Sequence, residues 1–482
     1  NLTLITGNFT DNSSNPLPTV IMQNSYGTLN WTVNGNLNIS HPFIGIEGTS
    51  NENATGRLTV NGNFNISGGS FEYCTRVNAL TEITVNGNTS ISGPVTKVRF
   101  NDGNNLDMNF ITNDFIVSNC NDIVLLGGNY SITLPGGTPT VTINNDFLLN
   151  GDCSVTILDS TASTRKTRVA VARDLISSSP NANLKLANNN GAVTLRVGRH
   201  LTYTGGNFIG QANNNSTGID SVIVIGNFTY NTTTPSNYFR ANYGVGNTFL
   251  AVTGNMSVLS SGTANNQGIS LIHIPPAMNM GTGQLNVTIG GTYLQNGGRF
   301  VGINRGAGAL TFNCTSGLFD MNGGVFIGIN NLDTIASGAA TYNLLGIDYD
   351  GGQFIAHNGS TIAGPVLSMN VTNNCKINYT AVTDQFRFIG LFLVQTSINM
   401  LPLNLTVGGN MTFTGVNGSF VSSHSVGTET INVTGNLSVS AGTNHFNVFP
   451  NSGYRTSGEY DRKWTGEYYR WPYNPLCRTG YP

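Results

Sequence analysis

One five-residue motif recurs along almost the whole chain and limits what the chain can fold into. The motif reads apolar-x-Gly-Asn-apolar, as in Val33-Asn-Gly-Asn-Leu37 and Val60-Asn-Gly-Asn-Phe64. About sixteen copies follow one another between Ile5 and Leu437, at steps of 25 to 37 residues. Repeats of this length are typical of solenoids, propellers and arrays, in which each unit packs only against its neighbours. One repetitive architecture is therefore expected.

The frame of the motif predicts extended strands. Its first and last residues are four apart and almost always apolar, so in a strand both point to the same face. The first positions are Ile5, Val33, Val60, Val85, Ile111, Ile143, Val171, Val197, Val224, Val252, Ile289, Cys314, Leu345, Val371, Val407 and Val433, and each last position follows four residues later, as Leu318 follows Cys314.

A second motif, Gly-Gly-x-Phe, follows in several repeats, as in Gly68-Gly-Ser-Phe71. Paired glycines permit a tight corner, and the aromatic residue starts the next inward-facing strand. A repeat with two or three short strands has the size of one β-helix coil, whereas a propeller blade needs about 40 residues. The sequence predicts an all-β parallel β-helix of about sixteen coils over residues 1–448, followed by a non-repeat segment over residues 449–482.

The composition argues against several partners. Only 9% of the residues are charged and the net charge is −2, so there is no basic patch for nucleic acid or for an anionic membrane surface. The longest apolar run, around Phe388, is far shorter than the roughly 20 residues that span a bilayer. The chain begins with Asn1 instead of Met, which would fit a removed signal peptide and an extracellular or cell-surface location.

The fourth position of the motif forms a column of similar residues. It is Asn in most repeats, from Asn8 to Asn436. Equivalent positions of successive coils lie about 4.8 Å apart, so these amides are expected to stack and to hydrogen-bond to one another.

The repeat resembles the Gly- and Asn-rich parallel β-helix proteins of bacterial surfaces, the pectin-lyase-like solenoids that include adhesins and autotransporter passengers. The resemblance covers residues 1–445 and lies in the Val-x-Gly-Asn-Leu pattern. It implies a rigid, secreted protein with a role at the cell surface. Some members of this group cleave or bind acidic polysaccharides.

The column turns acidic in the middle of the chain, where Asp114, Asp146, Asp174 and His200 fall on consecutive coils. Similar β-helix lyases and hydrolases use stacked carboxylates, with a metal or as an acid and base pair, together with basic groups that hold an acidic sugar. The alternative, which we prefer, is that Asp replaces Asn as an isosteric column residue and that nearby Arg and Lys side chains balance the charge.

No other catalytic signature is present. The six His residues are scattered and the chain lacks zinc-binding, nucleophile and dinucleotide-binding spacings, so we expect neither a metal nor a cofactor and no enzymatic activity.

The six cysteines allow one specific pairing. Cys120 and Cys153 occupy nearly the same place on adjacent coils, and a spacing of about 4.8 Å falls within the Cα range of a disulfide. We predict that they form a bridge. Cys314 and Cys375 occupy inward positions and are expected to be free core residues.

Asn-x-Ser/Thr sequons recur along the chain and are candidate N-glycan sites. Residues engaged in the stacked column are expected to be poorer acceptors than loop residues. The selected candidates are Asn8, Asn12, Asn30, Asn53, Asn214, Asn231, Asn358 and Asn417.

The segment after Phe449 leaves the repeat and is rich in aromatic residues, including Trp464, Tyr468, Tyr469 and Trp471. It could cap the last coil, whose strand edges would otherwise recruit another chain, or it could dock onto a neighbouring subunit. End-to-end contacts that do not close produce a filament. We therefore expect a secreted structural protein, either a filament subunit that self-associates end to end or a surface adhesin, with an enzyme acting on acidic polysaccharide as the alternative.

Overall fold

The computed structural model describes most of the chain before residue 448. The described residues are 2–11, 20–24, 27–47, 53–75, 78–102, 107–127, 139–160, 164–213, 215–261, 268–274, 282–331, 338–359, 366–389, 403–415, 419–421, 429–439 and 445–447. They form only strands, turns and bends, and they belong to one compact unit, residues 1–449. No helix among them is long and apolar enough to cross a bilayer.

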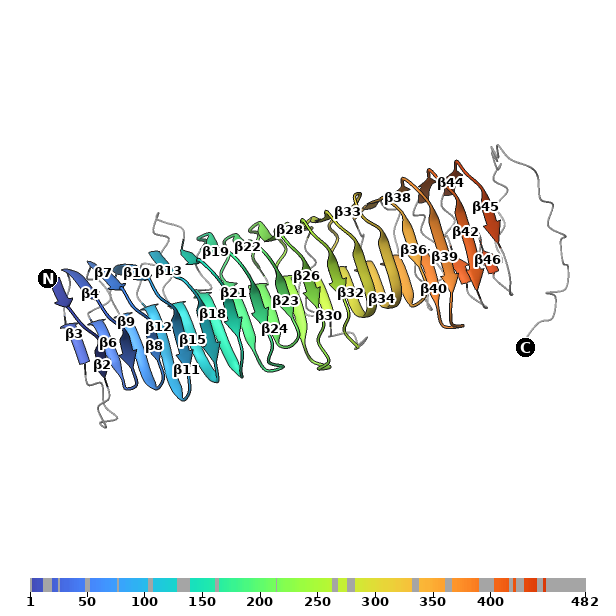
Figure 1. The fold of residues 1–482 in the computed structure, drawn as a ribbon. Coiled ribbons are helices and arrows are strands. Elements are labelled where there is room, and N and C mark those ends of the chain that lie inside the picture. The colour runs from blue at the N-terminus through green and yellow to red at the C-terminus, as the bar shows by residue number, and fades with distance from the viewer. Residues whose placement is uncertain are drawn as a thin grey trace, which may run out of the picture. The chain divides into compact units, whose positions relative to one another are not determined.

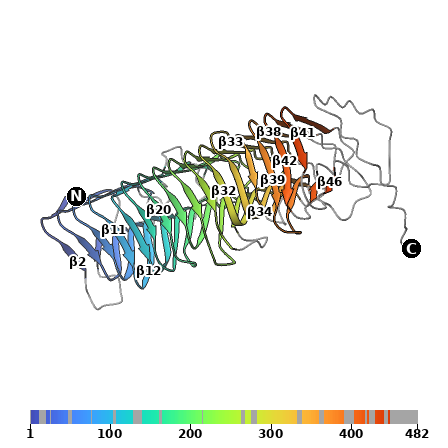
Figure 2. The ribbon, with the colours of Figure 1, turned by 45° about the vertical axis from the view of Figure 1, so that its right-hand side comes forward.

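The described strands form a parallel β-solenoid, as the repeat predicts. Each coil contributes one strand to each of three parallel ladders, and the strands of successive coils lie side by side along the axis (Figures 1 and 2). In each pairing the partner strand belongs to the next coil, as β4 pairs with β7 and β10 pairs with β13.

The first ladder contains sixteen strands and carries the residues that precede the Gly-Asn step of the motif. Its strands are β1 (Leu2–Ile5), β4 (Gly27–Val33), β7 (Asn53–Val60), β10 (Asn78–Val85), β13 (Asp107–Thr112), β16 (Thr140–Ile143), β19 (Thr167–Val171), β22 (Val193–Val197), β25 (Asp220–Val224), β28 (Thr248–Val252), β31 (Leu285–Ile289), β33 (Leu310–Cys314), β35 (Ala340–Leu344), β38 (Leu367–Val371), β41 (Leu403–Val407) and β44 (Glu429–Val433).

The second ladder begins directly after the Gly-Asn step. Its strands are β2 (Phe9–Asp11), β5 (Leu37–Ile39), β8 (Phe64–Ile66), β11 (Thr89–Ser92), β14 (Phe115–Ser118), β17 (Phe147–Leu149), β20 (Leu175–Ser177), β23 (Leu201–Tyr203), β26 (Phe228–Tyr230), β29 (Met256–Val258), β32 (Tyr293–Asn304), β34 (Phe319–Asn331), β36 (Ile347–Tyr349), β39 (Cys375–Tyr379), β42 (Met411–Gly415) and β45 (Leu437–Val439).

The third ladder closes each coil. It shares the long strands β32 and β34 with the second ladder, because these two strands run through the corner without a break. Its other strands are β3 (Val20–Asn24), β6 (Phe43–Glu47), β9 (Gly69–Thr75), β12 (Val95–Asp102), β15 (Cys120–Gly127), β18 (Cys153–Asp159), β21 (Asn183–Asn188), β24 (Asn207–Gln211), β27 (Tyr238–Asn242), β30 (Gly268–His273), β37 (Gln353–Gly359), β40 (Gln385–Ile389), β43 (Ser419–Val421) and β46 (His445–Asn447).

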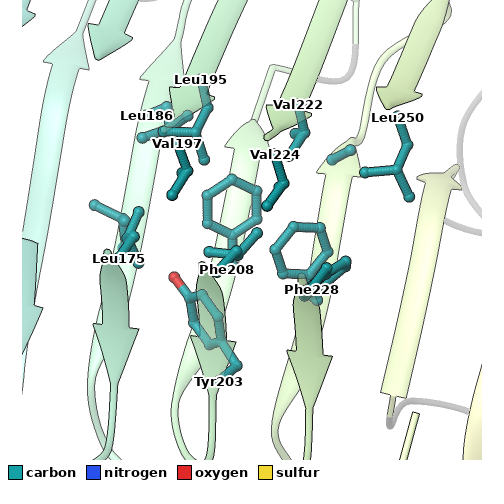
Figure 3. Close-up of a cluster of buried hydrophobic side chains, with 14 of the residues drawn as sticks. Leu175, Leu186, Leu195, Val197, Tyr203, Phe208, Val222, Val224, Phe228 and Leu250 are labelled. Atoms are coloured by element: carbon teal, nitrogen blue, oxygen red, sulfur yellow. The ribbon is translucent and has the colours of Figure 1, made fainter. Parts of the chain in front are cut away.

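The interior is a continuous apolar column between the three ladders. In β4 the alternating residues Leu29, Trp31 and Val33 are buried, as the period of two predicts. Figure 3 shows the same arrangement farther along, where Tyr203 and Phe208 lie among Leu and Val side chains of neighbouring coils. Aromatic rings of successive coils also stack on one another, and each such pair adds about 0.5–1.5 kcal/mol beyond the burial of its area.

The frame predicted at Ile111 is wrong by one residue. Ile111 pairs with Thr84, so Thr112 takes the inward place opposite Ile143. The Thr112 hydroxyl is buried but hydrogen-bonded, 2.9 Å from the hydroxyl of Thr89. The coil is one residue shorter at this corner, and a buried pair of hydroxyl groups compensates.

Two further frame positions need the same correction. Phe319, and not Leu318, pairs with Tyr293 in the second ladder, and the Leu318 side chain is 42% exposed. In the next coil Leu344 takes the inward place predicted for Leu345, and Asp348 consequently leaves the column for the outer face. A five-residue motif of fixed length misplaces the inward residues wherever a corner is one residue longer or shorter.

Candidate functional site

The fourth motif position forms a hydrogen-bonded column at the corner between the first and second ladders, which we call the corner column. In the described residues every member except Thr292 and Asn436 uses its side chain to accept the backbone N–H of the equivalent residue on the next coil, at 2.7–3.2 Å. Its members are Asn8, Asn36, Asn63, Asn88, Asp114, Asp146, Asp174, His200, Asn227, Asn255, Thr292, Asn374, Asn410 and Asn436.

The bonding in the corner column differs from the expected stacking of amide on amide. The Oδ1 atom of Asn36 accepts the backbone N–H of Asn63, and the amide nitrogens do not link the coils. Amide stacking does occur two residues earlier, where Asn61 Nδ2 donates to Asn34 Oδ1 at 2.9 Å and Asn86 Nδ2 donates to Asn61 Oδ1 at 2.8 Å. The corner column therefore requires only an acceptor at each place.

The acidic stretch of the corner column meets this requirement with carboxylates. Asp114 Oδ1 accepts the N–H of Asp146 at 3.1 Å, and Asp146 Oδ1 accepts the N–H of Asp174 at 3.0 Å. The bonds have the same direction as those of the Asn members. Asp is thus an isosteric substitute for Asn here.

Arginines that precede the column residues balance the carboxylates. Arg199 donates from Nε to Asp174 Oδ1 at 2.7 Å and from Nη2 to Asp174 Oδ2. This hydrogen bonding from Arg199 holds the pKa of Asp174 below its ordinary value. Arg173 Nε lies 3.6 Å from Asp146 Oδ1. Two of the basic side chains near the acidic stretch thus lie beside its carboxylates, as the preferred interpretation expects.

His200 takes the same acceptor role with its ring. Its Nδ1 atom accepts the backbone N–H of Asn227 at 3.2 Å, so the proton of the neutral ring lies on Nε2. The Nδ1 atom of His200 is therefore engaged in the hydrogen bonding of the corner column.

The four members of the acidic stretch are engaged in the corner column. In the described part of the chain no group of three or more His, Cys, Asp or Glu side chains is placed to hold a metal ion. A shallow hollow of about 200 Å³ lies on β18, β21 and β24, and none of the four acidic-stretch candidates lines it. The four candidate residues are brought into one line, but each is engaged in the scaffold.

The predicted disulfide is not formed, although its register is confirmed. Cys120 pairs directly with Cys153 in the third ladder, yet both are buried free thiols. Side chains of directly paired parallel residues leave the strands in the same direction, which keeps the Cβ atoms near the strand spacing of about 4.8 Å and beyond the disulfide mean of about 3.8 Å. Burial raises the pKa of Cys120 to about 11. Cys314 and Cys375 are free and buried, as predicted.

Only some of the sequon candidates have side chains that the structure describes. Asn8 and Asn231 are exposed, whereas Asn30 and Asn358 are half-buried. Asn53 lies in β7, but its side chain is outside the described part. The candidates Asn12, Asn214 and Asn417, and the assembly residues Trp464, Tyr468, Tyr469 and Trp471, also lie outside the described residues.

Several buried polar side chains escaped the sequence analysis. His357 in β37 and Asp220 in β25 are each only 2% exposed. Arg240 in β27 is nearly as buried, with its guanidinium carbon 4.0 Å from the centre of the Tyr238 ring. The Tyr-x-Arg spacing of that last pair was a visible signal. His357 had none, because it follows the buried Ala356 directly and so breaks the alternation from which burial was inferred.

Comparison with known proteins returned no match, whether with family models, with curated proteins or with solved structures. The assignment of a parallel β-solenoid therefore depends on strand pairing and burial in this chain alone.

Proposed function

We propose that this protein is a secreted structural element, a filament subunit or surface adhesin whose rigid solenoid is its working part, and not an enzyme. The observation that carries the proposal is the corner column. Even the acidic residues that a catalytic site would use accept backbone hydrogen bonds from the next coil, and two of them have arginines beside them. The polar residues of this corner act as scaffold.

Stiffness follows from how the coils are joined. Three parallel ladders, the corner column and a continuous apolar interior connect each coil to the next. Every rung of a parallel solenoid presents the same hydrogen-bonding surface along its axis, so a rung that is left uncovered can pair with another copy. End-to-end association into a filament is the assembly that this geometry favours.

Electron microscopy of the purified full chain tests the filament. Uniform fibres with the strands perpendicular to the fibre axis, and so with a repeat near 4.8 Å along it, are expected. Discrete particles at every concentration would contradict end-to-end stacking and would leave the adhesin as the structural role.

The alternative is a carbohydrate-active β-helix that uses Asp114, Asp146, Asp174 and His200 on an acidic polysaccharide. The full chain and an Asp146→Asn variant should be incubated with acidic polysaccharides, and new reducing ends or unsaturated products measured. We expect no turnover by either protein. Turnover by the parent that is lost in Asp146→Asn, a change that preserves the Oδ1 acceptor, would establish the enzyme and overturn the proposal.

A further inference from the structure

We propose that the corner column is a row of attachment sites for N-linked glycans, an inference that assumes the secretion in the proposed function. Six of its asparagines stand in Asn-x-Ser/Thr sequons, in which no proline intervenes. The six are Asn8, Asn88, Asn227, Asn255, Asn410 and Asn436.

The hydrogen bonding of the corner column leaves the reactive atom accessible. Asn255 uses Oδ1 to accept the N–H of Thr292 at 2.8 Å, and Asn410 uses Oδ1 to accept the N–H of Asn436 at 2.9 Å. Glycans attach to the other side-chain atom, Nδ2. Among the described residues, none receives a hydrogen bond from Nδ2 of these six asparagines, and all six side chains are exposed or half-exposed.

The chemistry of attachment preserves the column. A lipid-diphosphate-linked oligosaccharide is the donor, and a new bond forms between C1 of its first sugar and Nδ2. Nδ2 loses one proton, and the bond from C1 to the diphosphate oxygen breaks, so that the lipid diphosphate leaves. The amide carbonyl Oδ1 takes no part, and its backbone hydrogen bond to the next coil is retained.

Three sequons outside the corner column, at Asn65, Asn358 and Asn370, have the opposite geometry. Asn65 Nδ2 donates to Asn38 Oδ1 at 2.8 Å, and Asn370 Nδ2 donates to Asn343 Oδ1 at 2.9 Å. Here Nδ2 points at a side chain one coil away, at a strand spacing of about 4.8 Å, so a glycan would have to displace the neighbour. The same holds for Asn358, whose Nδ2 donates to an asparagine of the preceding coil at 2.9 Å. Participation in a column therefore does not by itself make a poor acceptor; the direction of Nδ2 decides.

Spacing along the column sets the occupancy of individual sites. Asn227 and Asn255 lie on adjacent coils, and so do Asn410 and Asn436, so two glycans within either pair would start about 4.8 Å apart and compete for space. Asn88 is isolated, because its column neighbours Asn63 and Asp114 are not in sequons. Asn88 is expected to be fully occupied and each adjacent pair to share occupancy.

The test is a site-by-site measurement on the full chain, secreted from a eukaryotic host behind a signal peptide. Glycans are released enzymatically in heavy-oxygen water, and the label at each asparagine is read by peptide mass spectrometry. We expect at least fivefold higher occupancy at Asn88 than at Asn65 or Asn370. Equal occupancy of the two classes, or a secreted chain whose corner sequons are empty, would overturn the inference.

Two matched variants separate the glycan from the column. Asn88→Asp retains the Oδ1 acceptor, as Asp114 does on the next coil, and removes Nδ2. Ser90→Ala removes the sequon and leaves Asn88 in place. Both should lose the glycan at this site and keep the thermal midpoint of the enzymatically deglycosylated parent. Electron microscopy of the same deglycosylated samples reports on the filament independently, so failure of the glycan inference and failure of the proposed function are distinguishable.

Discussion

His357 should make the C-terminal part of the solenoid sensitive to mild acid. Its ring lies in β37, in register between Ile329 on one coil and Ile389 on the other. Within the described part of the chain neither ring nitrogen has a hydrogen-bond partner, and the side chain is almost completely buried. Burial lowers the pKa of His357 from 6.5 to about 4, because the apolar surroundings disfavour the charged ring.

The sign and size of the effect follow from proton linkage. The unfolded ring takes up its proton near pH 6.5 and the folded ring only near pH 4, so the unfolded state binds more protons between these values. The free energy of unfolding is therefore unaffected above pH 7 and falls as the pH drops from 6.5 towards 4. Integrated down to pH 5, this difference in pKa corresponds to a loss of about 2 kcal/mol.

A local measurement is needed because a repeat protein does not unfold as one two-state unit. Hydrogen exchange of the β37 backbone amides, corrected for the intrinsic rate, should show about 30-fold less protection at pH 5 than at pH 7 in the native sequence. His357→Ile continues the column of isoleucines and should abolish this pH dependence. His200→Asn, which changes a histidine of the corner column, is the control and should leave the β37 response intact. Equal pH dependence of β37 in His357→Ile and in the native sequence would refute the reasoning.

Three further changes test the scaffold. Burial raises the pKa of Asp220 well above its ordinary value, so folding favours its protonated form and its contribution to stability is lost as the pH rises. Asp220→Asn should therefore raise the local free energy of unfolding of β25 by about 1–3 kcal/mol at pH 7 and by nothing near pH 3, measured by hydrogen exchange of the backbone amides around the changed residue. Asn63→Ala should cost about 1 kcal/mol, because the N–H of Asn88 loses its acceptor, whereas Asn63→Asp should be nearly neutral by the same assay. Burial raises the pKa of Cys74 to about 12, so a thiol reagent at pH 8 should modify it only after urea unfolds the chain; rapid native labelling would contradict its burial.

The fold could be predicted from the sequence because the alternation of apolar residues indicates strands and the repeat length matches one β-helix coil. Val33 and Leu37 are inward in the structure, as their spacing predicts. The errors at Ile111 and Leu318 arise where a corner changes length by one residue, which leaves the periodicity of each strand intact and so gives no signal in the pattern. The alignment of the acidic residues in one column could be predicted from the sequence. Their hydrogen-bond partners could not, since the conformation of the corner backbone decides whether a side chain bonds to a backbone N–H or to another side chain.

The Gly-Asn step of the motif has a single physical explanation. A Cβ atom on Gly62 would lie 2.4 Å from Asn36 Oδ1, and one on Gly87 would lie 2.4 Å from Asn63 Oδ1. The glycine therefore makes room for the acceptor of the preceding coil, and the asparagine that follows receives its hydrogen bond. Glycine provides the space in this step, and asparagine provides both the N–H donor and the acceptor for the next coil.

The acidic stretch lacks this glycine. Asn113 and Arg173 stand where other coils have Gly, directly before Asp114 and Asp174. The hydrogen bonds of the column nevertheless continue through the stretch, and its three carboxylates accept the next backbone N–H at 3.0–3.1 Å. A charged acceptor makes such a hydrogen bond roughly twice as strong as a neutral one. Since Asp146 and Asp174 also have an arginine beside them, the acidic line continues the column in a charge-assisted form.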